Sequence, residues 1–289
     1  MKTTGQVLDI GTARTSARTA FDVIGLREFF PRLHRRDVML AHLGWALMLF
    51  AAVFGVLFLT NPVLIGGVNA WIKPIKFCIS FGTYAWTVAW WFGYLRGNQT
   101  VLMFLRRGFF VTIALEILSI YLQAVRDVLT QHHLTASLDS AISATMTTMI
   151  FVNTLLVIWV AVMFWRDHFD LTPAYIWSIR LGIVVFLVGN AIGGQMLARH
   201  SHTIGAADGP SGIPFLNWST IGGDLRIAHF LSIHAIQVIP LVAFLLECFR
   251  PRWSQTRQKL AVFVTTAAFS IFVALTWLEA MLGIPLLRM

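Results

Sequence analysis

The sequence predicts an all-α fold, an integral membrane bundle of seven helices. Hydrophobic residues make up 57% of the chain and charged residues only 12%, whereas charged residues are about a quarter of a soluble protein. Seven apolar stretches reach the roughly 20 residues that a helix needs to cross a bilayer. These stretches use up most of the 289 residues, so we expect no separate soluble domain.

The N-terminal segment, residues 1–37, is polar and basic. It carries seven Lys or Arg against four acidic residues and lacks the apolar core of a signal peptide. Its second half sets Phe29 and Phe30 among arginines, as in an amphipathic helix that lies on anionic lipid, although a loosely ordered basic tail is the alternative. We therefore divide the chain into a basic cytoplasmic segment, 1–37, and a seven-span transmembrane domain, 38–289.

The loops between the predicted spans are of two kinds. Lys and Arg fall in alternate loops, on the side of the basic N-terminus, so the positive-inside rule places the N-terminus in the cytoplasm and the C-terminus outside. The outer loops are longer and richer in turn residues, notably 61–71 and 199–223, which makes the outer face the expected working face. The predicted spans are approximately residues 38–60, 75–95, 108–126, 141–165, 175–197, 225–248 and 259–284.

The sixth span carries the most unusual set of polar residues. Arg226, His229, His234 and Gln237 lie in its first half, within an arc of roughly 140° on a helix. Unpaired polar groups inside a bilayer cost several kcal/mol, so ionisable residues in a span indicate a functional site. We expect one face of this helix to point at something polar.

The second span begins with a polar face. Lys73, Lys76, Ser80, Thr83 and Thr87 recur at intervals of three and four residues, which stacks them on one side of a helix. In a functional interpretation they hold two cations over an outer cavity. In the structural alternative the lysines extend to the outer interface and the hydroxyls bond their own helix.

The third span repeats this pattern with Glu116, Ser119, Gln123 and Arg126. Glu116 is expected near the middle of the membrane, where a carboxylate must be protonated, paired or hydrated. The functional interpretation makes it a proton or cation carrier at the floor of a pocket, with Arg126 at the mouth. A neutral, hydrogen-bonded Glu inside the bundle is the structural alternative.

The two histidines of the sixth span could titrate together with an acid. His229 and His234 are five residues apart and splayed by roughly 140°, which is poor geometry for one metal ion. Glu279 in the seventh span has a similar depth, and Glu116 is a second available partner. A His–Glu pair would couple ligand binding to pH. Two buried histidines paired with acids for structural reasons are the alternative.

Other chemistry is weakly indicated. His200 and His202 beside Asp208 form a metal pattern of low specificity, and no two spans carry histidines at equal depth for haem. Cys78 and Cys248 are expected near opposite faces, too far apart for a disulfide. The net charge of +9 comes mostly from residues beside span ends, so nucleic acid is not an expected partner. We assign no metal ligands, and the sequence does not identify a cofactor or a catalytic residue.

Three stretches resemble a bacterial family of uncharacterised multi-span membrane proteins. They are WIKPIKF (71–77), LQAVR (122–126) and GGDLRIAHFLSIHAIQVIPL (222–241). The resemblance covers most of the helical region and implies a bacterial inner-membrane location, without an activity. After LQAVR the family continues with a glycine and a Ser-His-Phe-Asn run, whereas this chain reads DVLTQHHLTASLD, so the resemblance implies no role for that loop.

The sequence therefore predicts a polar pocket that opens outward and favours an anionic or amphiphilic ligand, because cations outnumber acids at its rim. Three functions stay open. The first is binding and translocation of a small molecule, coupled to protons in one version. The second is a membrane-embedded enzyme for a lipid or quinone of the outer leaflet, with His229 or His234 as base or ligand. The third is a sensor or accessory subunit with a protein partner or a second copy. The expected pocket residues are Lys73, Lys76, Glu116, Gln123, Arg126, Arg226, His229, His234, Gln237 and Glu279.

Overall fold

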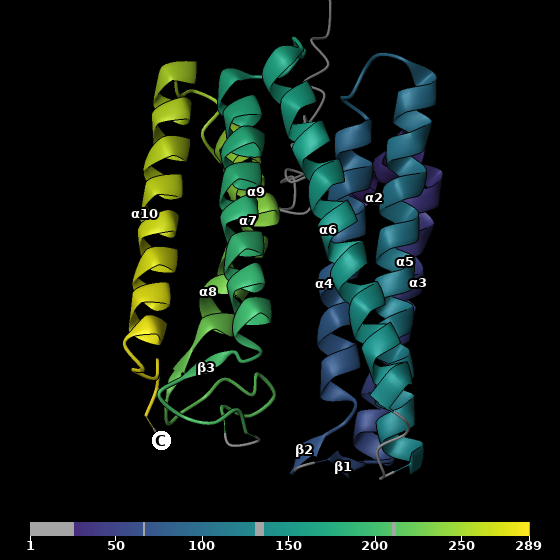
Figure 1. The fold of residues 1–289 in the computed structure, drawn as a ribbon. Coiled ribbons are helices and arrows are strands. Elements are labelled where there is room, and N and C mark those ends of the chain that lie inside the picture. Colours follow the sequence, from purple (N-terminus) through teal and green to yellow (C-terminus); the bar gives the residue numbers. More distant parts are fainter. Residues whose placement is uncertain (1–25, 66, 131–135, 210–211, 289) are drawn as a thin grey trace, which may run out of the picture.

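The described chain forms a bundle of helices with two short hairpins (Figure 1). A computed structural model describes residues 26–65, 67–130, 136–209 and 212–288, except for the side chains of 26–27, 125–130 and 136–139. The elements are α2 (Leu26–Arg36), α3 (Val38–Thr60), β1 (Leu64–Ile65), β2 (Val68–Asn69), α4 (Ile72–Phe92), α5 (Gln99–Thr130), α6 (Ala136–Arg166), α7 (Pro173–Arg199), β3 (Thr203–Ile204), β4 (Gly223–Asp224), α8 (Leu225–Ile233), α9 (Ala235–Phe249) and α10 (Gln255–Met281). β1 pairs with β2, and β3 with β4, both antiparallel.

Several helices are suited to a membrane. Within the described residues, α3, the part Ser140–Arg166 of α6, α7 and α10 are each long and apolar enough to cross one. The pair α8 and α9, bent by 45° at a short break, adds a fifth candidate if it is one span. The prediction of an all-α membrane protein is thereby confirmed. The helices α4 and α5, which the sequence also predicts as spans, are long enough but are not among these candidates in the part of the chain described.

The bundle consists of two halves. In the first half α4 packs on α3 and α5, and α5 packs on α6; in the second half α7 packs on α8, α9 and α10. The halves meet where α6 contacts α7 and where α4 contacts α9. The largest apolar core fills the first half and extends to α7, and two smaller cores lie among α7 to α10. The polar residues of α4 therefore lie beside the contact between the halves.

The second half packs closely because α7 presents glycine where α8 crosses it. A Cβ at Gly189 would lie only 2.5 Å from the Oγ of the buried Ser232. Small residues permit such close approach of membrane helices. The sequence predicts one continuous helix over 225–248, but the structure bends it at His234. Pro240 cannot donate to the carbonyl of Ile236, which loosens the turn that follows the bend.

The helix α2 is held against the bundle by its apolar face. Phe29 stacks on Trp90 at a ring-centroid distance of 5.1 Å, and Leu33 is fully buried. Asp37 then caps α3 by accepting the N–H of Leu40, and it pairs with Arg106 of α5 at 2.7 Å. This ion pair sets the beginning of α3 level with Arg106. The N-terminal residues before α2, on which part of the amphipathic-helix prediction depends, lie outside the described residues.

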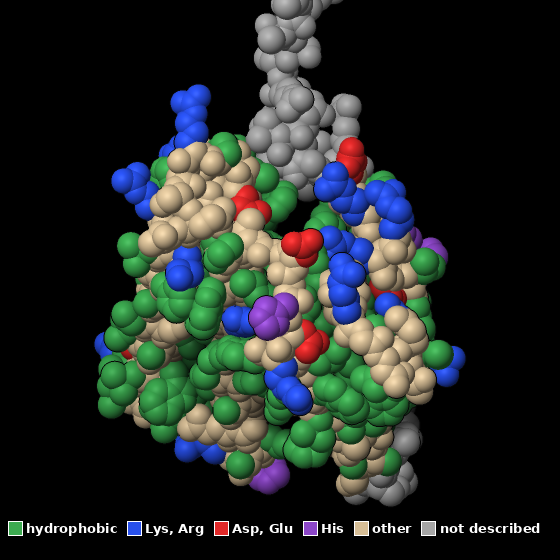
Figure 2. All heavy atoms as spheres, turned by 90° about the horizontal axis from the view of Figure 1, so that it is seen from above, with side chains coloured by type: hydrophobic (Ala, Val, Ile, Leu, Met, Phe, Trp, Pro, Cys, Tyr) green, Lys and Arg blue, Asp and Glu red, His purple; other side chains and the backbone are tan. Residues whose placement is uncertain are grey.

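Basic side chains gather at the end of the bundle where α2 lies. This end also holds the short connections from α4 to α5, α6 to α7 and α9 to α10, whereas both hairpins lie at the opposite end (Figure 1). Figure 2 looks onto this end and shows Lys and Arg side chains over both halves. The exposed arginines of these segments are Arg32, Arg35, Arg96, Arg107, Arg166, Arg250, Arg252 and Arg257.

Candidate functional site

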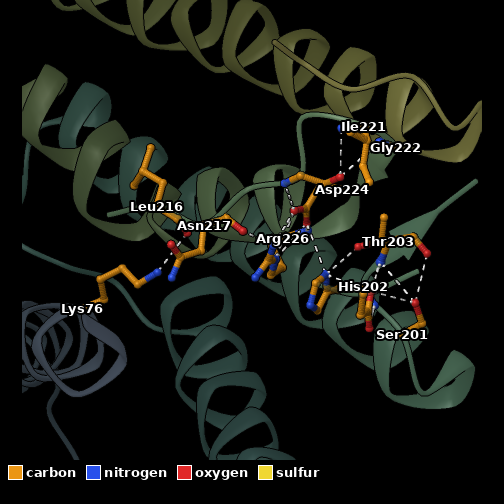
Figure 3. A network of polar contacts seen from close by, with 12 residues as sticks. Lys76, Ser201, His202, Thr203, Leu216, Asn217, Ile221, Gly222, Asp224 and Arg226 are labelled. Atoms are coloured by element: carbon orange, nitrogen blue, oxygen red, sulfur yellow. Dashed lines mark hydrogen bonds and ion pairs between the residues drawn. The ribbon is translucent and has the colours of Figure 1, made fainter. Parts of the chain in front are cut away.

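A buried ion pair organises the chain at the start of α8 (Figure 3). The carboxylate of Asp224, which is only 1% exposed, lies 2.6 Å from Nη2 of Arg226 and accepts the backbone N–H of Ser219 at 2.8 Å. Asp224 is also the N-cap of α8, because its side chain accepts the backbone N–H of Arg226. Loss of one partner would leave a buried charge without compensation. Asp224 thus fixes the loop at Ser219 and the first turn of α8 together.

His202 extends this network to the loop that leads into β3. Its Nδ1 lies 3.3 Å from Asp208 and 3.9 Å from Asp224. Burial lowers the pKa of His202, and the nearby Arg226 lowers it further, while the two carboxylates oppose this shift. Asp208 also accepts the backbone N–H of Thr203 at 2.9 Å. Among the described residues no three His, Cys, Asp or Glu side chains lie close enough to hold a metal ion.

Two cations hold the segment Leu216–Asn217 from opposite sides. Lys76 of α4 donates to the carbonyl oxygen of Leu216 at 3.0 Å, and Arg226 of α8 donates to the carbonyl oxygen of Asn217. Phe215 and Asn217 have left-handed backbones, with φ of 65° and 58°. Asn tolerates this conformation, but it is strained for a bulky Phe. The segment therefore presents backbone oxygens to both cations at some conformational cost.

The bend between α8 and α9 contacts α4 one turn beyond Lys76. Ser80 Oγ lies 3.1 Å from Nε2 of His234, the residue at the bend, and Phe230 packs on the His234 ring at 4.6 Å between centroids. We call Lys76, Ser80, Arg226 and His234 the polar seam. It joins α4 of the first half to the broken helix of the second half, and Lys76 and Arg226 reach the segment Leu216–Asn217 from its two sides (Figure 3).

Three further predicted residues lie near the polar seam. Lys73 donates to Gln123 at 3.0 Å, which joins α4 to α5 near the end of the bundle that holds the hairpins. Gln237 lies in the first turn of α9, where its side chain interacts with His234 and its amide oxygen is buried. Arg126 belongs to the last turns of α5, but its side chain lies outside the part of the structure described.

His229 and Glu279 have other surroundings. Nδ1 of His229 donates to the carbonyl oxygen of Gly189 at 2.8 Å, and the ring lies against Gly193, so this histidine faces α7. Glu279 is half-buried near the end of α10 and makes no side-chain hydrogen bond or ion pair with the described residues. The paired His–Glu titration expected from the sequence has no direct contact to support it among these side chains.

Glu116 belongs to a separate polar cluster inside the first half. It is 4% exposed, it has no hydrogen bond or ion pair in the described part of the chain, and it lies close enough to Tyr84 for an electrostatic interaction. Tyr84 donates to Asn153 Oδ1 at 2.6 Å, and Asn153 donates to Thr112 Oγ1 at 2.8 Å. Tyr84 also stacks on Phe186 of α7, with 5.9 Å between the ring centroids. The cluster therefore connects α4, α5 and α6 beside α7.

Sequence reasoning missed residues in both regions, although weak signals were present. Asp224 directly precedes an apolar helix, which is the usual place for an N-cap. Tyr84 continues the polar face of α4 four residues after Ser80, and Asn153 is an isolated amide within an apolar span. No sequence signal indicated the role of Leu216–Asn217, because a backbone carbonyl acts there irrespective of the side chain.

Comparison with known protein families, with curated proteins and with solved structures gives no match to this chain. The contacts described above are therefore the basis for the proposed function. The most informative are those of the polar seam, because they combine charged side chains with an interrupted helix.

Proposed function

We propose that this chain is a seven-span protein of a bacterial inner membrane that binds and translocates a small anionic or amphiphilic molecule at the polar seam. In this proposal α4, α5 and the bent pair α8–α9 cross the membrane together with α3, α6, α7 and α10. The exposed arginines at the α2 end support a cytoplasmic N-terminus, because positive charge accumulates on the inner side. The C-terminus and both hairpins then face outward.

The contact between His234 at the bend and Ser80 on α4 carries the proposal. Non-helical backbone at membrane depth is tolerated where it is buried in protein or lines a polar cavity. Interrupted helices of this kind form the substrate sites of many secondary transporters, at the contact between two structural units. The bend of 45° lies where the two halves of this bundle meet.

The charge at the outer end of the polar seam favours an anion. Lys76 and Arg226 each donate to a backbone oxygen of Leu216–Asn217, and these partly negative oxygens occupy the positions that a carboxylate or phosphate would take. A binding anion would replace the two carbonyls. Release of the strained backbone at Phe215 and Asn217 then favours opening of the loop.

Proton coupling is assigned to Glu116. Its position without a cationic partner in the described part of the chain makes its charge state sensitive to the surrounding field. The cluster of Tyr84, Asn153 and Thr112 extends from α4, the same helix that carries Lys76 and Ser80. A change in the charge of Glu116 can therefore reach the polar seam through α4.

Thermal unfolding of the purified protein tests anion binding. The probes are short-chain carboxylates, alkyl sulfonates and phosphate monoesters, each added separately at millimolar concentration. At least one of them should raise the Tm of the wild type, because a ligand at 100 times its Kd stabilises the folded state by about 2.7 kcal/mol. Lys76→Gln should lose this shift.

Arg252→Gln is the matched control, because it removes one exposed cation at the opposite end of the bundle. It should keep the full shift in Tm. A wild type that none of these anions stabilises, or an equal loss in both variants, would contradict the proposed function. Tightly bound lipid, quinone or metal in the same preparation would favour the enzyme hypothesis, and a co-purifying protein would favour the accessory-subunit hypothesis.

A further inference from the structure

A groove lies between α5 and α6, away from the polar seam. It has a volume of about 530 Å³ and is open on one side. On α5 its lining residues follow a helical repeat of three and four, and α6 supplies the opposite wall. Its apolar residues are Met103, Phe104, Val111, Met149, Val152 and Leu156.

The floor of the groove is formed where Gly108 of α5 meets Leu156 of α6. A Cβ at Gly108 would lie 2.8 Å from Cδ1 of Leu156, so the two helices are in contact there. Next to this contact, Thr112 turns its hydroxyl back to the carbonyl oxygen of Gly108 and adds little bulk. The larger side chains Phe104 and Val111 stand at the rim, 57% and 47% exposed. The groove runs along the helix pair for about 16 Å, from residue 100 to residue 111.

One unpaired cation, Arg107, lines this groove. Arg107 is exposed and makes no ion pair, hydrogen bond or ring contact with the described residues, whereas the adjacent Arg106 is paired with Asp37. The ion pair of Arg106 with Asp37 also fixes how far Arg107 lies along the bundle, because Asp37 caps the first turn of the apolar helix α3. Arg107 therefore lies at the level where the apolar part of the bundle begins. Side chains on a helix tilt toward its N-terminus, so the guanidinium extends away from the apolar part.

We propose that this groove binds an anionic phospholipid of the inner leaflet. The phosphate lies on Arg107 near Thr100, and one acyl chain lies along Val111, Val152 and Met149. Charge complementarity favours an anionic headgroup, because the groove combines one free cation with apolar walls and has no acidic residue among those that line it. The choice of the inner leaflet rests on the orientation given under the proposed function; the site itself does not.

Native mass spectrometry of the full chain in mild detergent tests this site. The probes are phosphatidylglycerol and phosphatidylcholine with identical acyl chains, titrated separately. The wild type should bind the first phosphatidylglycerol more tightly than phosphatidylcholine. Arg107→Gln should weaken phosphatidylglycerol binding about fivefold, the equivalent of ~1 kcal/mol for one cation at a lipid surface, and should abolish the preference.

Two matched controls separate the groove from the general surface. Val111→Trp fills the groove and should weaken the binding of both lipids. Val162→Trp, at a similarly exposed position of α6 outside the groove, should weaken the binding of neither. Arg252→Gln should leave the lipid preference intact. Unchanged binding in both Arg107→Gln and Val111→Trp would overturn the proposal, as would an equal loss in the controls. The outcome is independent of the anion shift at Lys76, so each proposal can fail without the other.

Discussion

The two buried polar regions of this protein are built in opposite ways. At the start of α8, Asp224 is fully satisfied, since it pairs with Arg226 and accepts backbone N–H groups. In the first half of the bundle, Glu116 is almost as deeply buried but has no hydrogen bond or ion pair with the described residues. Removing one partner of a buried ion pair is costly, whereas a carboxylate without a partner can change its charge without breaking a contact. We therefore expect Asp224 to hold the fold together, and the proposed function gives proton exchange to Glu116.

The largest effect is expected when the satisfied carboxylate is removed. Asp224→Ala leaves the partly exposed guanidinium of Arg226 without its partner, removes the cap of α8 and frees the loop at Ser219. We expect a loss of about 3–5 kcal/mol of unfolding free energy. Unfolding in detergent measures it. Asp208→Ala is the control, because its carboxylate is 36% exposed and its loss should cost only about 1–2 kcal/mol, for the bonds from the backbone N–H groups of His202 and Thr203. If both variants lose the same unfolding free energy, Asp224 does not have the structural role described.

A medium effect is expected from the amide next to Glu116. Asn153→Leu keeps the number and branching of the side-chain heavy atoms but leaves the Tyr84 hydroxyl without its acceptor and Thr112 without its donor. A buried polar group left unsatisfied costs about 1–3 kcal/mol, and unfolding of this variant should show such a loss. Tyr84→Phe in the same background should restore part of it, because the orphaned hydroxyl is then gone. If the double variant is no more stable than the single one, the network does not act as described.

A small effect on stability is expected at the unsatisfied carboxylate itself. Glu116→Gln breaks no hydrogen bond or ion pair in the described structure, so its unfolding free energy should stay within about 1 kcal/mol of the wild type. Anion uptake into proteoliposomes should, in contrast, lose its response to an imposed pH gradient. Glu28→Gln, at the exposed surface of α2, should retain that response. A large loss of stability in Glu116→Gln would show that this residue is structural after all.

The smallest effect is expected from His202 at the edge of the Asp224 network. Its pKa is lower in the folded state than in the unfolded chain, so protonation favours unfolding. The stability contributed by neutral His202 is complete above about pH 6.5 and is lost as the pH falls toward its lowered folded pKa. His202→Gln should therefore flatten the decline in Tm below pH 6.5, whereas the exposed His200→Gln should not. Parallel curves for all three proteins would exclude His202 as a source of the decline.

Hydropathy predicted the helices of this fold well, because apolar length is a property of each stretch alone. The predicted span 38–60 coincides with Val38–Thr60, and the others differ from the observed helices mainly at their ends. The bend at His234 was not predicted, since hydropathy runs on without a break through this stretch; in the structure Pro240 follows the bend and Ser80 of α4 contacts it. Whether a bent pair crosses the membrane once depends on the surrounding bilayer as well as the chain.

The candidate site was predicted less completely because spacing gives a helix face but not its neighbour. Lys73, Lys76 and Ser80 share one face of α4, yet they reach α5, the outer loop and the bend respectively. His229 and His234 are close in sequence, but the first faces α7 and the second faces α4. Only the packing of the two halves decides which polar residues come together.

Uptake into proteoliposomes tests the central claim, that an anion passes the polar seam, most directly. Vesicles with wild type, Lys76→Gln or Arg252→Gln are incubated with the carboxylates, sulfonates and phosphate monoesters, and their washed contents are identified by mass spectrometry. The account predicts that the wild type and Arg252→Gln accumulate at least one of these anions above protein-free vesicles and that Lys76→Gln does not. Equal accumulation by Lys76→Gln and the wild type, or none by any protein, would contradict it.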